Sequence, residues 1–101
     1  MLNSTHPAYM PALNRLLGEG GTRFTQHLAP TASCCPARVS LLTGRLAHCS
    51  NVTANRGLGG GYWKYIKEGL DATSLPLWLQ GAGYRTMLVG KLLNGFMVST
   101  E

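Results

Sequence analysis

Glycine and proline interrupt this chain so often that it can form only short elements joined by many turns. Thirteen glycines and five prolines are spread over 101 residues, with no low-complexity run and no internal repeat. Hydrophobic residues make up 45% of the chain and charged residues only 13%, although a domain this short buries only a modest core. This balance is typical of a piece of a large α/β protein rather than of a free-standing small domain.

Apolar side chains that recur on one face predict three helices. A proline in the first turn or a capping residue before the helix supports each of them, and a glycine ends each. The three expected helices cover residues 9–17, residues 36–43, and the segment from Thr73 or Ser74 to Ala82.

Two segments predict strands. Residues 22–27 alternate in polarity and residues 84–89 read as a buried strand. Residues 45–61 are expected to be irregular, and residues 62–69 fit neither pattern. A helix followed by a strand, with Gly90 and Lys91 at its carboxyl end, predicts an α/β fold with function at the end of that strand.

The charge of the chain favours a small anionic partner. Nine Lys and Arg residues against four Asp and Glu give a net charge of +5, and such a charge attracts anions. The basic residues are scattered and form no block of the kind that binds nucleic acid. We therefore expect no nucleic-acid partner, and no membrane span, because no apolar run approaches the ~20 residues that a span needs.

The three cysteines are Cys34, Cys35 and Cys49. Adjacent cysteines rarely bond to each other, and an odd number leaves a free thiol or a partner elsewhere. Neither zinc-ligand spacing nor a C-x-x-C motif is present. Cys35 is expected to be buried packing, whereas Cys49 is either free or paired outside this chain.

The beginning of the helix expected over 36–43 brings together the residues that an oxyanion requires. A helix N-terminus presents free N–H groups and attracts anions, and Cys34 lies just before the turn that holds Pro36. Arg38 follows about one helical turn later, so its guanidinium can reach back to the same point. This convergence suits sulfate or phosphate chemistry, while an ordinary buried cysteine beside a surface arginine stays open. A thiol-phosphatase loop does not fit, because the position where it needs arginine holds Ser40.

Two segments resemble the signatures of type I sulfatases. Cys34-Cys35-Pro36-Ala37-Arg38 with Leu42-Thr43-Gly44-Arg45 is similar to C-x-P-x-R followed by T-G-R. Gly83-Tyr84-Arg85-Thr86 through Gly90-Lys91 is similar to the second signature, a G-Y-x-T strand that ends in G-K. Both occur in the family's order, and the helix Leu75-Pro76-Leu77-Trp78-Leu79-Gln80 resembles the fungal arylsulfatase and N-acetylglucosamine-6-sulfatase branch.

The resemblance implies a fold and a domain assignment. Residues 1–101 are then a fragment of a single N-terminal catalytic domain, with the first signature at 34–45 and the second at 83–91. The fold implied is a partial alkaline-phosphatase-like α/β fold with an incomplete central sheet.

The resemblance also implies a chemistry centred on Cys34. A formylglycine-generating enzyme of the secretory pathway oxidises this residue to an aldehyde, and the aldehyde hydrate attacks the sulfur of a sulfate ester. The alcohol leaves, and the second hydroxyl collapses to the aldehyde and expels sulfate. Arg38 would hold the hydrate, Lys91 would bind a sulfate oxygen, and Asn94 would contact the substrate.

Calcium is the metal that the resemblance implies, with the formylglycine at position 34 as one contact. The family takes its other ligands from an aspartate pair upstream and an Asp-Asn pair downstream, and Asp71, the only aspartate of the chain, matches neither. Leu93 also stands where many sulfatases carry a histidine. We therefore expect an incomplete calcium site and an isolated chain that is inactive and poorly folded.

Several alternatives remain open from the sequence. The substrate implied is either an aryl sulfate or a sulfated sugar such as a glucosamine 6-sulfate. Two other functions also remain open: a phosphate-ester hydrolase of the same superfamily and a non-catalytic remnant. Tyr62, Trp63 and Tyr65 form either a ring-binding surface or core, and His48 either lines the pocket or is exposed. The resemblance implies the secretory pathway, extracellular or lysosomal. No signal peptide follows Met1, and Asn51 is a candidate glycosylation site.

Overall fold

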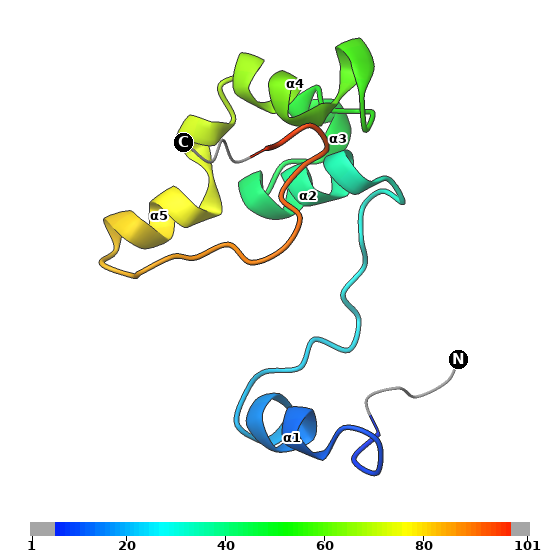
Figure 1. Cartoon of the computed structure of the whole chain (residues 1–101), viewed down its shortest axis with the longest axis vertical. Helices are drawn as coiled ribbons and strands as arrows, with labels where there is room; N and C mark the ends of the chain where they lie inside the picture. Colours follow the sequence, from blue (N-terminus) through cyan, green and yellow to red (C-terminus); the bar gives the residue numbers. More distant parts are fainter. Residues whose placement is uncertain (1–5, 98–101) are drawn as a thin grey trace.

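The computed structural model describes residues 6–97, which form short helices joined by loops (Figure 1). The elements, in chain order, are α1 (Pro11–Leu13), the π-helical η1 (Asn14–Glu19), α2 (Cys34–Thr43), α3 (Ala47–Ser50), the 3-10 turn η2 (Gly57–Gly59), α4 (Gly61–Lys67), the 3-10 turn η3 (Asp71–Thr73) and α5 (Leu75–Gly81).

The expected strands at 22–27 and 84–89 are wrong for this structure. No residue between 6 and 97 belongs to a strand, and the one β-bridge described joins Ala54 to Gly60. A strand exists only where a second strand accepts its hydrogen bonds, and neither segment meets one. Residues 84–89 instead run extended from α5 back towards α2 (Figure 1). They are also not buried, because Met87 and Val89 are 88% and 83% exposed.

The predicted helix at 36–43 is confirmed as α2, which begins two residues earlier, at Cys34. Ser33 is extended before it, and Pro36 lies in its first turn, where a missing N–H costs nothing. The helix ends at Gly44, which adopts a left-handed φ of 68° and donates its N–H to the Ser40 carbonyl at 2.9 Å. Glycine reaches that conformation without a steric penalty.

The other helix predictions are confirmed with local differences. The helix expected up to Ala82 is α5, but the Ser74 hydroxyl donates to the Asp71 carbonyl rather than capping α5. The helix expected over 9–17 is α1 continued by the wider turns of η1. The ambiguous residues 62–69 fall largely in α4, and the irregular stretch 45–61 contains α3 and η2.

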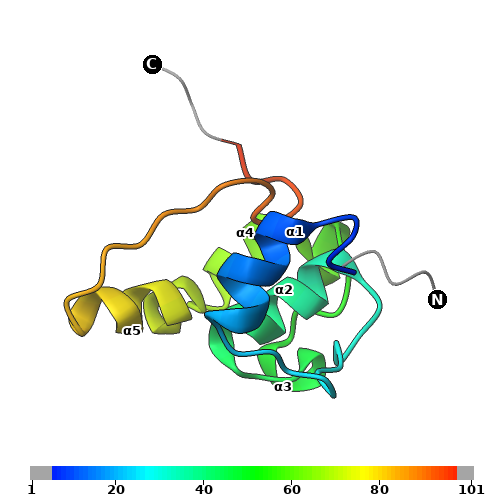
Figure 2. The same ribbon diagram turned by 90° about the horizontal axis from the view of Figure 1, so that it is seen from below.

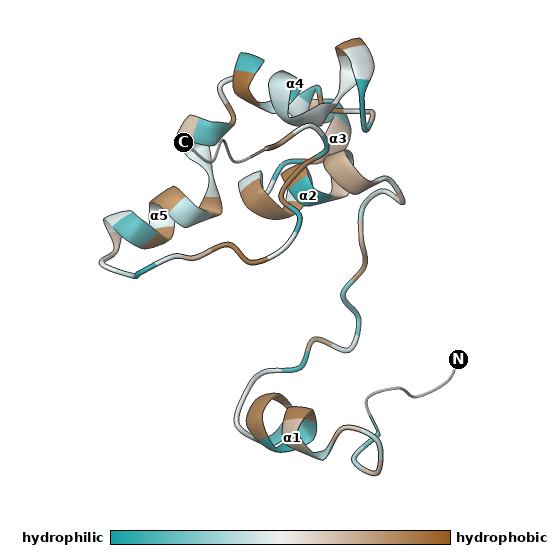
Figure 3. Cartoon of the chain, in the orientation of Figure 1, coloured by the Kyte–Doolittle hydropathy of each residue, from teal (hydrophilic) through white to brown (hydrophobic). Residues whose placement is uncertain are grey.

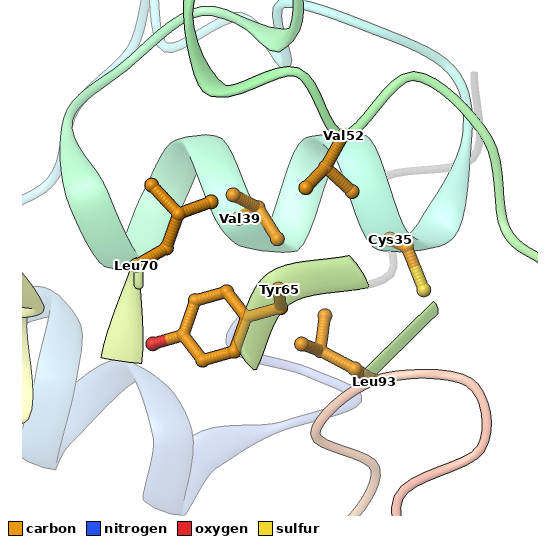
Figure 4. Packing of buried hydrophobic residues seen from close by; sticks show 6 residues of the cluster. All are labelled: Cys35, Val39, Val52, Tyr65, Leu70 and Leu93. Carbon is orange, nitrogen blue, oxygen red and sulfur yellow. The ribbon is translucent and has the colours of Figure 1, made fainter. Parts of the chain in front are cut away.

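A small hydrophobic core joins α2, α4 and three loops (Figure 4). The fully or almost fully buried members are Cys35 and Val39 of α2, Tyr65 of α4, and the loop residues Val52, Leu70 and Leu93. Burying one aliphatic side chain contributes about 1.5–3 kcal/mol. Because Leu93 lies two positions after Lys91 and packs in the core with Cys35 and Val39, this core fixes the loop that follows the second signature against α2.

The N-terminal helices stand apart from this core. Figure 1 shows α1 and η1 joined to α2 by a long extended segment. In Figure 2 the molecule is viewed along this segment, so α1 and η1 are seen in front of α2. Leu16 and Leu17 are more than 60% exposed, and the hydropathy colouring in Figure 3 shows an apolar surface on these turns. The radius of gyration is 16.2 Å, against about 13 Å for a compact chain of this length.

Candidate active site at the start of α2

Cys34 is the first residue of α2 and is exposed to solvent. Ser33 turns the extended chain into the helix, and its carbonyl accepts the Ala37 N–H at 3.0 Å. The side chain of position 34 therefore stands at the positive end of a ten-residue helix. A helix N-terminus of this kind attracts an anion.

Arg38 makes a different contact from the one expected. Its Nη1 donates a hydrogen bond to the backbone carbonyl of Lys91, whereas the sequence suggested that it reaches back to Cys34. The guanidinium has five donors, so this bond leaves others for a ligand. Arg38 thus brings the end of the second signature next to the first turn of α2, and the exposed Lys91 follows with it.

Cys35 is completely buried, as expected, and it also takes part in a hydrogen-bond network. Its backbone N–H donates to Asn55 Oδ1 at 2.8 Å, which satisfies one of the free donors of the helix start. Its Sγ accepts the backbone N–H of Asn94 at 3.2 Å and lies 3.4 Å from Asn94 Oδ1. Asn94 is therefore held at the site through Cys35.

The run of glycines before α4 makes this arrangement possible. A Cβ on Gly60 would lie 1.7 Å from the Ala54 carbonyl oxygen, and a Cβ on Gly61 would lie 3.2 Å from the Asn94 carbonyl oxygen. The chain thus needs bare backbone where the loop of Asn55 and the loop of Asn94 meet α4. Gly61 also has a φ of +80°, which side chains rarely adopt.

An open hollow of about 610 Å³ adjoins the network. Asn55, Asn94, Arg56, Tyr62 and Trp63 line it together with glycine backbone. Tyr62 packs edge-on against Phe96 at 5.0 Å, and Trp63 is 57% exposed beneath Lys67.

The three aromatic residues Tyr62, Trp63 and Tyr65 lie in two different environments. Tyr65 belongs to the core, where burial raises the pKa of its hydroxyl despite a hydrogen bond with Ser74. Tyr62 and Trp63 face the hollow.

Asn55 is the residue of this site that the sequence did not single out. Its signal was present in the triple glycine Gly59-Gly60-Gly61, because a cluster of glycines marks a close approach of backbone segments. An amide side chain four residues before such a run is a natural partner for a helix start.

The described residues do not form a calcium site. Calcium takes six to eight oxygen ligands, and residues 6–97 contain no group of three or more His, Cys, Asp or Glu side chains that could hold a metal ion. Asp71 lies in η3 beside the Ser74 end of the core, away from the start of α2.

The remaining candidate residues lie on the surface. His48 and Cys49 are exposed on α3, and Cys49 is a free thiol, as are Cys34 and Cys35. Asn51 is exposed, and its Nδ2 donates to Glu68 Oε1 at 3.1 Å. Within the described part of the chain, none of the helices has the length and apolar character of a membrane-spanning segment.

The family model described as Sulfatase matches residues 1–101. The chain belongs to the sulfatase family. This membership confirms the expected family and implies an alkaline-phosphatase-like fold. The described residues are mostly helical and contain no strand.

The relatives of this sulfatase chain include arylsulfatases, extracellular sulfatases and N-acetylglucosamine-6-sulfatases. It is 42% identical over 97 residues to an arylsulfatase of Chlamydomonas reinhardtii and 38% identical over 89 residues to a putative extracellular sulfatase Sulf-1 homolog of Caenorhabditis elegans. It is 35% identical over 82 residues to human N-acetylglucosamine-6-sulfatase. These alignments cover 96%, 87% and 80% of this chain but only 15%, 12% and 15% of the relatives. No solved structure matches the chain significantly.

Proposed function

We propose that this chain is part of the catalytic domain of a sulfate-ester hydrolase and that Cys34 is the precursor of its nucleophile. The observation that carries the proposal is the position of Cys34, exposed at the first residue of α2, with Arg38 and Lys91 joined beside it by a hydrogen bond. The motif that an oxidising enzyme would read, C-x-P-x-R, is complete from Cys34 to Arg38.

In this proposal each residue has a separate task. Oxidation converts the thiol of Cys34 to an aldehyde, whose hydrate supplies the oxygen that attacks sulfur. Arg38 uses donors not engaged by Lys91 to hold that oxygen, and the ammonium group of Lys91 binds a sulfate oxygen. Asn94 meets the substrate from the neighbouring loop. Calcium, which the family resemblance implies, would need oxygen ligands from outside residues 6–97.

The proposed substrates are aryl sulfates or sulfated sugars. The hollow lined by Tyr62 and Trp63 supports a ring-shaped leaving group, because aromatic faces and exposed backbone groups suit both kinds of ring. The proposed route is secretory, supported by the extracellular sulfatase names of two relatives. On that route Asn51, which is exposed, is the proposed glycan acceptor.

Mass spectrometry of the peptide that contains Cys34 tests the proposal. The chain is produced together with a formylglycine-generating enzyme, and we expect the aldehyde in place of the thiol at Cys34. The matched variant Arg38→Ala interrupts the motif and keeps the thiol. An unmodified Cys34 in the wild-type chain would favour a non-catalytic remnant.

Activity is tested in a chimera, because we propose that the isolated chain releases no sulfate. The 97-residue matched part of this chain replaces the corresponding segment of the Chlamydomonas arylsulfatase, and hydrolysis of an aryl sulfate is followed by release of the phenol. We expect Cys34→Ala to abolish turnover and Lys91→Ala to lower kcat/KM by about a hundredfold or more, the cost of one charge-assisted contact in the transition state. Chelator-sensitive sulfate release by the 101-residue chain alone would contradict the proposed need for further ligands.

A further inference from the structure

The sulfur of Cys35 is the meeting point of three segments that are far apart in the sequence. Asn55 lies 20 positions away and Asn94 lies 59 positions away, and both contact this residue. Sγ accepts the Asn94 N–H at 3.2 Å, and the thiol hydrogen has two acceptors within reach, Asn94 Oδ1 at 3.4 Å and the Asn55 carbonyl at 3.6 Å. A methyl or isopropyl group could fill this space but could make none of these bonds.

Cys35 and Arg38 act on the same loop. They lie three residues apart on α2 and therefore share a face of the helix. Arg38 binds the carbonyl of Lys91, and Cys35 binds Asn94. The segment 91–94 is thus attached to the first turn of α2 at both of its ends, and Leu93 between them is buried with 2% of its surface exposed.

We propose that Cys35 is a positioning residue, which holds Asn94 at a fixed place against the first turn of α2 through the hydrogen bonds of its sulfur. The catalytic meaning of this role rests on the function proposed above for Cys34. The role differs from packing in its chemistry, because a buried N–H that loses its acceptor is destabilised even when the space is filled. A polar replacement should therefore serve better than an apolar one of similar volume.

Amide hydrogen exchange of the chimera described above, measured by mass spectrometry with fragmentation that resolves single amides, tests this proposal. The reporter is the Asn94 N–H, and the reference is the Gly44 N–H, which binds the Ser40 carbonyl at the other end of α2. The variants are Cys35→Ala, Cys35→Val and Cys35→Ser. The matched control is Val39→Ala, which alters an equally buried residue of the same helix that makes none of these sulfur bonds.

In the chimera with the wild-type segment we expect the Asn94 N–H to be protected. Cys35→Ala and Cys35→Val should accelerate its exchange relative to Gly44 by about two- to tenfold, the value of one hydrogen bond. Cys35→Ser should return the ratio to within about twofold of wild type. Val39→Ala should accelerate both amides by the same factor, because it weakens the core as a whole.

Two results would overturn the proposal. One is an Asn94 N–H that exchanges in the chimera with the wild-type segment as fast as exposed amides, which needs no variant at all. The other is a Cys35→Val chain that keeps the wild-type ratio, since bulk would then suffice. If Cys35→Ala does not fold, Cys35→Val and Cys35→Ser still separate bulk from polarity.

The same samples separate this proposal from the sulfatase assignment. Every Cys35 variant keeps C-x-P-x-R, because position 35 is its variable residue, so formylglycine formation at Cys34 should be equal in all of them. If Cys34 is not converted to formylglycine but exchange of the Asn94 amide responds to the Cys35 variants, only the proposed nucleophile is refuted. If Cys34 is converted normally but the Asn94 amide does not respond, only the proposed role of Cys35 is refuted.

Discussion

Replacing Gly60 by alanine should damage the candidate site from a distance, without touching Cys34, Arg38 or Lys91. The new Cβ would lie 1.7 Å from the Ala54 carbonyl oxygen and 2.9 Å from the Asn55 nitrogen. Both neighbours are backbone atoms, so no side chain can turn aside. The two segments must separate by roughly 1–2 Å to reach ordinary van der Waals contact.

The cost of this separation follows from the hydrogen bonds nearby. The N–H groups of Thr53 and Ala54 donate to the Gly59 carbonyl at 2.8 and 3.0 Å, and Asn55 accepts the Cys35 N–H at 2.8 Å. Two or three lost bonds at about 0.5–1.5 kcal/mol each give a loss of about 1–4.5 kcal/mol. A domain of this size has about 5–15 kcal/mol in total, so the loss is a large share.

Urea denaturation followed by circular dichroism measures this loss, and the reaction of Cys35 with a thiol reagent in native buffer measures the opening of the site. Gly81→Ala is the matched control, because a Cβ there meets nothing within 4 Å. It ends α5, where alanine should be neutral or stabilising by at most about 0.5–1 kcal/mol. Equal midpoints and equal thiol reactivity in the two variants would refute the reasoning.

Three further changes have expected outcomes. Leu70→Ala removes a side chain that is 2% exposed and should cost about 2–5 kcal/mol in the same urea assay, with an unchanged midpoint contradicting the core assignment. The hydrogen bond from Lys64 lowers the pKa of Glu68 in the folded chain, so the stability that this ion pair contributes is present at neutral pH and is lost as pH falls below the ordinary value of 4.5. The Glu68→Gln variant should therefore lose less stability on acidification than the wild-type chain. Thermal melts across that pH range measure the difference. Burial raises the pKa of Tyr65, so the stability that its neutral form contributes is lost as pH rises above the ordinary pKa of 10.0. In the Tyr65→Phe variant the melting temperature should fall less steeply at alkaline pH. The same pH dependence in both chains would contradict the burial of Tyr65.

The helices were predictable because their signals are local. Pro36 in the first turn and Gly44 after the last one delimit α2 within the sequence itself, and the same holds for α5 between Ser74 and Gly81. The strand expected at 84–89 was wrong, because an apolar pattern describes a segment suited to a sheet, whereas a strand forms only with a partner. No part of residues 6–97 supplies that partner.

The candidate site shows the same division. Sequence reasoning identified Cys34 and Arg38 from a short motif and Lys91 from a second one, and the structure brings these segments together through the Arg38 bond to the Lys91 carbonyl. The direction of that bond was not predictable, because it depends on where a loop 53 residues away returns. Asn55 escaped notice for the same reason, since its partner Cys35 is 20 positions away.

The extended stretch 84–89 makes the self-association of the isolated chain depend on its concentration. Its apolar side chains are exposed, with Tyr84 at 65% and Leu88 at 54%, and its backbone lies outside every helix and strand described. Such a stretch can accept hydrogen bonds from the same stretch of another molecule, while the net charge of +5 opposes the encounter. Added salt screens that repulsion, so dilute solutions of low ionic strength keep the chain monomeric.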